Sequence, residues 1–276
     1  ALVKRVYQIA YATDSDGDMI ESDMKTVTTR EALYFTITES FRTHIKQKDL
    51  AFLFQPVVQW NNRAIAFLLP HLNPQILFGT KTDIVAALHY HDLWPLLVQQ
   101  IIIHLGHLAK RWALMSLSIP RFGLHLPNRV ARDTKAIDDI IAYVHKAKLD
   151  PSHIIFICSY RFWTLVHQRN IQTLCEAGFG LGLSDWALNI PASDTEQLRM
   201  FEYGYLNHDE FSRCSETWLL QAASLFQKGL IYDHEHHVLK RSELDLKHIH
   251  LVYGDLYPSL DESKLIEARS ERGENE

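Results

Sequence analysis

Histidine is the residue type that first suggests chemistry in this chain. The 276 residues include 16 His but only 3 Cys, and imidazole is the commonest metal ligand in proteins. The densest group, Asp-His-Glu-His-His at 233–237, combines residue types that suit zinc. These residues fall where an expected strand meets its loop, however, and neighbouring residues of a strand point in opposite directions. We therefore interpret the run as a solvated polar loop and keep metal binding by it as the alternative.

Two other patterns that resemble metal sites fail on their spacing. Residues 14–18 (DSDGD) have the acidic start of a calcium loop, but its sixth and twelfth positions are Met19 and Lys25 instead of Gly and Glu. His104 and His107 would share one face of a helix, but no carboxylate lies near them at helical spacing. The sequence therefore predicts no metal or other cofactor.

The overall composition argues against several classes of protein. The chain has 28 Lys and Arg against 33 Asp and Glu, a formal net charge of −5, which disfavours a general nucleic-acid binder. Cys158, Cys175 and Cys214 form no CxxC pair, so neither a disulfide framework nor a Cys-based zinc site is expected. The most apolar stretch, 93–119, is interrupted by polar and charged residues and predicts no membrane span. We expect a cytoplasmic domain without direct membrane contact, and an anchor upstream of Ala1 stays open.

The elements that must position any site follow from the apolar periodicity. Residues 28–47 have apolar side chains at helical spacing and predict an amphipathic helix. Two strand-like runs, 51–60 and 64–69, flank a turn at 61–63 and predict a hairpin. Beyond the hairpin, helical and strand-like segments alternate. The expected helices are 83–111, 129–148, 161–177, 194–203, 216–228 and 238–247, and the expected strands are 114–119, 154–158, 180–183, 204–206, 230–232 and 249–253.

This alternation predicts an α/β fold with a parallel sheet built from βαβ units. About eight strands in one chain favour a closed, TIM-like (β/α)8 barrel, and the hairpin adds one antiparallel strand. We expect a lead-in segment at 1–27, a barrel at 28–260 that includes the helix 28–47, and a charged tail at 261–276 that is a frayed helix or disordered.

Five segments of the chain, in this order, resemble the landmarks of the EAL domain, the cyclic-di-GMP phosphodiesterase barrel. They are FQPVV at 54–58, the hairpin strand AIAFLL at 64–69, IIFICSY at 154–160, GFGLGLSDWA at 178–187 and VYGDLYP at 252–258. The resemblance covers residues 28–258 and implies a barrel with one antiparallel strand, in agreement with the pattern of elements. It also implies a pocket at the carboxyl ends of the strands, where active members bind two divalent cations that activate a water molecule.

The residues at the matching positions depart from that chemistry. Hard cations need oxygen ligands from several strands, yet the positions of three metal-binding carboxylates hold Leu68, Phe156 and Ser184. The position of the phosphate-binding Arg holds Leu72, beside His71. The other positions of this vestigial pocket hold Gln55, Ser118, Asp185, Asn207, Asp209, Asp233, His236 and Tyr253.

The resemblance therefore implies a catalytically inactive member. Asp185 and Asp233 cannot hold a pair of hard cations alone, and without the metals no water is activated at neutral pH. Cyclic-di-GMP carries two phosphate charges, which are costly to bind without an Arg or a metal. We therefore rank a protein–protein adaptor above a non-hydrolysing cyclic-di-GMP receptor, and both above an active phosphodiesterase.

Among inactive members, the chain most resembles the CsrD class of degenerate GGDEF–EAL regulators. Three features carry this likeness: the altered pocket positions, the helix that leads into the barrel, and GDLY at 254–257. It implies a parent chain in the inner membrane with a cytoplasmic EAL domain. It also implies a protein partner, the glucose-specific IIA phosphotransfer protein, and an effect on small-RNA turnover or biofilm control.

Overall fold

The computed structural model describes residues 17–77, 79–161, 163–190, 196, 198–234, 248–254 and 257–273. The chain divides into two compact units. One consists of Ala1–Asp49 with Pro74–Asp92, and the other of Leu50–Asn73 with Leu93–Glu276. Within the described residues, no helix combines the length and the apolarity that crossing a bilayer requires.

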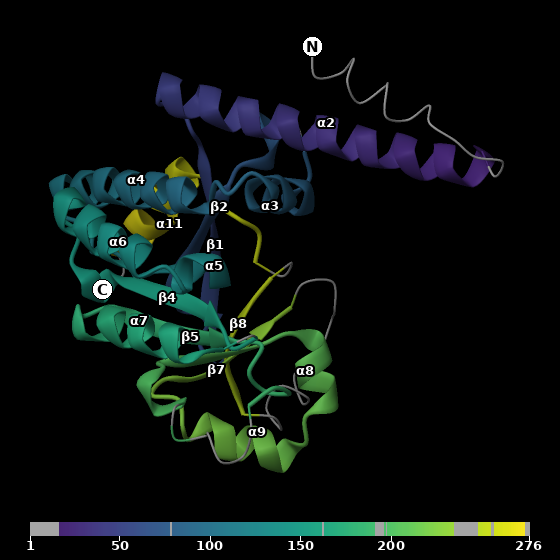
Figure 1. Ribbon diagram of the computed structural model, residues 1–276. Coiled ribbons are helices and arrows are strands. Elements are labelled where there is room, and N and C mark those ends of the chain that lie inside the picture. Colours follow the sequence, from purple (N-terminus) through teal and green to yellow (C-terminus); the bar gives the residue numbers. More distant parts are fainter. Residues whose placement is uncertain are drawn as a thin grey trace. The chain divides into compact units, whose positions relative to one another are not determined.

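The first unit is built on a long helix that begins earlier than the expected 28–47. Its elements are α2 (Gly17–Gln47), η1 (Pro74–Ile76) and α3 (Lys81–Tyr90). α2 packs on α3, and Ile37 and Phe41 of α2 are fully buried (Figure 1). Thr80 and Asp83 form a capping box that satisfies the free N–H groups at the start of α3.

The second unit contains a closed eight-stranded barrel (Figure 1). Its strands are β1 (Phe52–Gln59), β2 (Ile65–Leu72), β3 (Phe122–Leu126), β4 (Ile154–Ser159), β5 (Gly180–Ser184), β6 (Tyr203–Leu206), β7 (Gly229–Asp233) and β8 (Ile249–Tyr253). β1 is antiparallel to both β2 and β8, and all the other pairs are parallel. The predicted TIM-like barrel with one antiparallel strand is confirmed.

Alternate residues of the strands fill the barrel interior, as the period-2 geometry of a strand requires. The interior cluster consists of Val57, Phe67, Leu69, Ile155, Ile157, Tyr203, Tyr205, Ile231, Leu251 and Tyr253. Gly182 has no side chain at its interior position, and a Cβ there would overlap the ring of Tyr205. The barrel is therefore a packed core, and any site must lie at one of its ends.

Helices surround the strands of this unit. They are α4 (Trp94–Leu114), α5 (Asn128–Ala131), α6 (Thr134–Ala147), η2 (Pro151–His153), α7 (Leu165–Glu176), α8 (His208–Arg213), α9 (Glu216–Ala223) and α11 (Glu262–Gly273). The helix expected at 83–111 is two helices, because Asp92 takes a left-handed backbone conformation (φ 54°) and α4 then begins at Trp94, with Pro95 in its first turn. The helix expected at 238–247 lies outside the described residues.

The strand expected at 114–119 is wrong. α4 continues through Leu114, and the chain then turns at Ser116, whose φ is 56°. The strand of this repeat, β3, begins at Phe122. The apolar residues near 114 belong to the end of an amphipathic helix, in which Trp112 is fully buried, and a short apolar run does not distinguish a helix from a strand.

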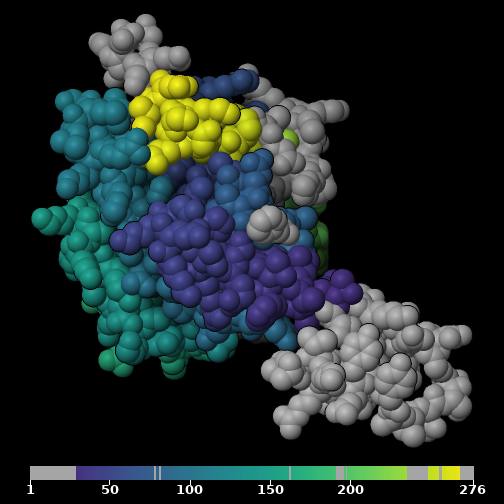
Figure 2. All heavy atoms as spheres, turned by 90° about the horizontal axis from the view of Figure 1, so that it is seen from above, coloured from purple at the N-terminus to yellow at the C-terminus, as the bar shows by residue number. Residues whose placement is uncertain are grey.

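The charged tail, expected to be frayed or disordered, forms a helix that packs on the barrel unit. Leu265 of α11 is fully buried, and the α11 residue Glu262 forms an ion pair with Arg111 of α4. Just before α11, Leu260 and Phe54 exchange two backbone hydrogen bonds of 2.8 Å. In Figure 2 the yellow C-terminal segment lies on the surface beside the teal of α4.

Candidate functional site at the barrel mouth

The candidate site is the barrel mouth, which we define as the inward positions at the carboxyl ends of the parallel strands. Because β1 runs antiparallel, its amino end lies at this mouth, where Phe52 pairs with Leu72 of β2. Side chains on one face of a strand recur at every second residue. Moving along each strand in steps of two from its interior residues therefore leads to the residue that faces the mouth, which lies on the strand or directly after it. The mouth residues are His71, His125, Ser159, Ser184, Asn207, Asp233 and Tyr253, and we include Gln55, which pairs with Leu69 and lies one step deeper than Leu53, the partner of His71.

Five of the residues proposed from the sequence for the pocket lie at the mouth. They are Gln55, Ser184, Asn207, Asp233 and Tyr253. Asp233 and Tyr253 are direct neighbours on β7 and β8, and Tyr253 meets Tyr205 edge to face, with ring centroids 6.1 Å apart. Tyr205 is fully enclosed below them, and its burial raises the pKa of its phenol. Aromatic rings therefore form the floor of the mouth.

Three other residues proposed for the pocket lie on the opposite face of their strands. Leu68 and Phe156 each lie between two interior residues, so their side chains point outward toward the helices, where both are fully buried. Leu72 pairs with Phe52 on the same outer face. These corrections do not add acidic groups to the mouth, because the inward residues next to the three positions are Phe67, Leu69, His71, Ile155 and Ile157.

Ser118 lies at the other end of the barrel. It precedes β3 and is therefore near the amino end of that strand, whereas the mouth is at the carboxyl ends. The mouth residue on β3 is His125, whose ring lies 6.4 Å from that of Tyr205. Sequence reasoning missed His125 because it placed the strand too early; the alternation at 122–126 was the available signal.

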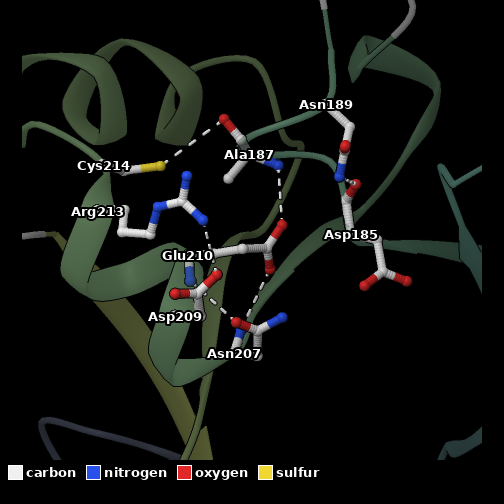
Figure 3. Close-up of polar contacts among 8 residues, drawn as sticks. All are labelled: Asp185, Ala187, Asn189, Asn207, Asp209, Glu210, Arg213 and Cys214. Carbon is white, nitrogen blue, oxygen red and sulfur yellow. Dashed lines mark hydrogen bonds and ion pairs between the residues drawn. The ribbon is translucent and has the colours of Figure 1, made fainter.

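Asp185 directly follows β5 and belongs to a tight turn. Its backbone is left-handed, with φ 55°, a conformation that Asp tolerates better than most residues. Its Oδ2 accepts a hydrogen bond of 2.6 Å from Ser159 Oγ. Figure 3 shows that its backbone carbonyl oxygen accepts another, of 2.7 Å, from Asn189 Nδ2. This carboxylate therefore joins the ends of β4 and β5.

Glu210 is a buried carboxyl group near the mouth that the sequence reasoning did not single out. Its Oε1 accepts a hydrogen bond from the Ala187 backbone N–H at 3.1 Å, and its Oε2 accepts one from the Asn207 backbone N–H at 3.3 Å (Figure 3). Burial, with the nearby Asp185 and Asp209 charges, raises its pKa to about 7. The signal in the sequence was the capping box of α8, in which Asn207 and Glu210 are three residues apart.

Asp209, another residue proposed for the pocket, points to solvent. Its carboxylate is 69% exposed and forms an ion pair of 3.1 Å with Arg213 of the same helix. Asn207 uses its Oδ1 to accept a hydrogen bond from the Glu210 N–H at 2.9 Å, so its side chain caps α8. Both residues have structural partners in α8.

The possible metal ligands of the described chain do not gather into a site. Among those residues no three His, Cys, Asp or Glu side chains lie close enough to share an ion. Of the run 233–237, only Asp233 and His234 are described, and His236 lies outside that part. His104, for which no acidic neighbour was found along its helix, lies 4.0 Å from the Glu262 carboxylate of α11.

Comparison with solved structures identifies the type of barrel. No family model matches the sequence, and no curated protein matches it. Among solved structures, the EAL enzyme Bd1971 in its cGMP-bound form is 11% identical, with a TM-score of 0.69 over 98% of this chain and 75% of that one. This is an EAL-type barrel.

Two further structures show the same EAL-type barrel. The PaMucR phosphodiesterase in complex with c-di-GMP is 13% identical, with a TM-score of 0.67 over 83% of this chain and 99% of that one. The Xanthomonas citri FimX EAL domain in complex with c-di-GMP is also 13% identical, with a TM-score of 0.64 over 84% and 96%. The expected EAL-type fold is confirmed.

Proposed function

We propose that this EAL-type barrel is a regulatory module that binds a protein partner and does not hydrolyse cyclic-di-GMP. The observation that carries the proposal is the set of side chains at the mouth. It consists of two imidazoles, two serine hydroxyls, two amides, one phenol and a single carboxylate, that of Asp233. A pair of hard cations takes oxygen ligands from several strands, and carboxylates are the usual source.

Two further carboxyl groups near the mouth, Asp185 and Glu210, do not remove this shortage. Asp185 accepts a 2.6 Å hydrogen bond from Ser159, which already occupies one of its oxygens. Glu210 accepts two backbone hydrogen bonds, and its raised pKa of about 7 leaves it partly protonated at neutral pH. The described residues of the mouth therefore do not fit two divalent cations, and we derive no hydrolytic step from them.

The proposed mode of action is that of an adaptor. The resemblance to the CsrD class suggests the glucose-specific IIA phosphotransfer protein as partner and an effect on small-RNA turnover or biofilm control. It also suggests a cytoplasmic domain whose parent chain is anchored in the inner membrane. Two adjacent exposed apolar side chains at the start of α7, Leu165 (83%) and Val166 (49%), support a function carried by the outer surface.

A non-hydrolysing cyclic-di-GMP receptor is the second candidate. The PaMucR and FimX structures are complexes with this dinucleotide, and their barrels are similar to this one. His71 and His125 at the mouth are able to donate hydrogen bonds to phosphate oxygens. We rank this function lower because the described mouth contains no arginine, the side chain that binds phosphate in a bidentate manner.

Three measurements on the full chain test the proposal. Incubation with cyclic-di-GMP and Mg²⁺ or Mn²⁺ is expected to yield no linear product above the buffer control; sustained turnover contradicts the proposal. Calorimetric titration with the dinucleotide is expected to show no binding, and binding without turnover favours the receptor. Pull-downs with and without the dinucleotide are expected to retain the same partner, whereas a partner that depends on the dinucleotide reverses the ranking.

A further inference from the structure

A basic and apolar surface lies beside the mouth, after the carboxyl ends of β3 and β4. Arg129 and Arg132 follow β3, Arg161 follows β4, and all three are exposed. Leu165 and Val166 are the first two residues of α7, and they are 83% and 49% exposed. We call these five residues the arginine rim.

Hydrogen bonds join the two segments that carry the arginine rim. Asn128 donates from Nδ2 to the carbonyl oxygen of Arg161 at 2.9 Å. Asn170 of α7, which is 1% exposed, donates from Nδ2 to the carbonyl oxygen of Ala131 at 2.9 Å. Because these bonds tie the turn after β3 to the turn after β4 and to α7, the rim is one surface with a defined shape.

The charge of the rim is opposite to that of the whole chain. Three arginines lie on these two segments in a protein of net charge −5, and the guanidinium group of Arg132 also donates a hydrogen bond of 3.2 Å from Nε to Nε2 of His167. The carboxylate that follows them, Asp133, caps α6 by accepting a hydrogen bond from Ala136 N–H at 3.2 Å. Arginine beside exposed aliphatic side chains is a composition typical of protein interfaces, in which Arg is enriched and apolar side chains lose water.

We propose that the arginine rim docks an acidic face of a protein partner, whose carboxylates pair with the guanidinium groups and whose apolar side chains cover Leu165 and Val166. This inference rests on the proposed adaptor function and identifies the surface through which the chain would bind its partner. Arginine pairs with carboxylates in a bidentate manner, and a surface that is already ordered loses little entropy on binding. A nucleic acid fits less well, because its phosphates would meet two exposed aliphatic side chains and a chain of net charge −5.

The test begins with a photo-crosslinker, p-benzoylphenylalanine, placed at Leu165 of the full chain. Proteins of the source cell that crosslink are identified, and the identified partner is purified as the probe for titration. The proposal expects the crosslinked segment of the partner to be acidic and its affinity to fall as salt rises. The proposal is contradicted if ribonuclease treatment abolishes the capture of proteins, or if the chain binds anionic vesicles and no protein.

Charge reversal then tests the arginines against a matched control. Arg129→Glu with Arg161→Glu is expected to weaken binding of the purified partner by about tenfold or more. Lys110→Glu with Lys146→Glu makes the same change in net charge on exposed positions of α4 and α6, and is expected to leave affinity within about twofold. Equal losses in both variants show that only net charge matters and contradict the assignment.

A third variant separates the assignment from the proposed function and from misfolding. Leu165→Ser changes no charge at a side chain that is 83% exposed, so we expect an unchanged melting temperature but weaker partner binding. If the partner binds but neither the charge-reversal variant nor Leu165→Ser weakens it, the adaptor function stands and the arginine rim is not its surface. If no protein crosslinks at Leu165 and the pull-downs retain none, the adaptor function itself fails.

Discussion

At the scale of single residues, Glu210 links protonation to the stability of the barrel. It is 3% exposed and holds the turn after β5 to the start of α8 through the N–H groups of Ala187 and Asn207. Its pKa rises from 4.5 to about 7, first because of burial and then because of neighbouring carboxylates. A raised carboxyl pKa stabilises the folded state below the unfolded pKa, and this contribution is lost as pH rises through the folded pKa.

The substitution Glu210→Gln tests this coupling. Between pH 5 and pH 8 the free energy of unfolding of the wild type should decrease by about 2 kcal/mol more than that of the variant, because the amide does not titrate. Urea unfolding at the two pH values measures the difference. Glu196→Gln, at a carboxylate that is 80% exposed and is not among the groups that shift the Glu210 pKa, is the control and should retain the pH dependence of the wild type. Equal slopes for wild type and Glu210→Gln would refute the coupling.

A second residue-scale feature is an ion pair near the amino ends of the strands. Arg121 donates two hydrogen bonds to the Glu202 carboxylate, of 2.6 and 2.9 Å, and Lys228 adds a third of 3.0 Å. Burial acts to raise the pKa of Glu202, but the hydrogen bonds from Arg121 and Lys228 outweigh it and hold that pKa below its usual value. The Glu202 side chain is 16% exposed, so its charge depends on these partners.

Arg121→Met should therefore destabilise the barrel by about 2 kcal/mol, because it leaves a partly buried carboxylate with one cation. Denaturant unfolding at pH 7 measures the loss. Arg213→Met removes an exposed partner from Asp209 and should cost less than about 0.5 kcal/mol. A result in which both variants lose the same stability contradicts the role assigned to burial.

At the scale of elements, α11 shows how a segment with an ordinary charged composition becomes part of the packed structure. Its first turn places Glu262 beside Arg111 and His104 of α4, and Leu265 is fully buried. The backbone pairing of Leu260 with Phe54 sets the position from which the helix starts. The element is amphipathic over a single turn, which is too short a pattern to predict packing from the sequence.

Leu265→Ala should lower the free energy of unfolding by about 3 kcal/mol, because it removes a buried side chain and leaves a cavity. Lys264→Ala, at the preceding and exposed position, is the matched control and should change stability by less than about 0.5 kcal/mol. Thermal or urea unfolding checks both. If the two variants are equally stable, α11 does not pack on the barrel as described.

At the scale of the whole molecule, barrel closure joins segments from the two ends of the second unit. Val58 and Gln59 of β1 pair with Val252 and Leu251 of β8. Without β8, β1 and β7 would each present an unpaired edge, and the interior residues Leu251 and Tyr253 would be missing from the core.

Truncation before Ile249 should therefore abolish cooperative unfolding of the barrel. Near-ultraviolet circular dichroism during urea titration is the measurement, and we expect loss of the tertiary signal and of the sigmoidal transition. Truncation after Gly273 keeps β8 and α11 and should unfold as the full chain does. A cooperative transition with an unchanged midpoint in the shorter chain contradicts the closure argument.

Much of this fold follows from local patterns that the sequence already displays. The hairpin signal at 61–63 and the alternation of short strands with helices predicted a barrel with one antiparallel strand, because turn chemistry and side-chain periodicity act over a few residues. The likeness of FQPVV and GFGLGLSDWA to EAL landmarks predicted the type of barrel. Of the residues proposed for the pocket, Ser184 and Asp233 are the last residues of β5 and β7, and Gln55 lies within β1.

Only the tertiary structure decided which side chains face the mouth. Leu68 and Phe156 point toward the helices because side-chain direction reverses at every residue of a strand, so a one-residue difference in register moves a side chain from the mouth to the outer layer. The burial of Glu210 and the approach of Glu262 to His104 depend on packing between elements that are distant in the sequence. The sequence by itself determined the class of barrel, and long-range packing decided the chemistry that its mouth presents.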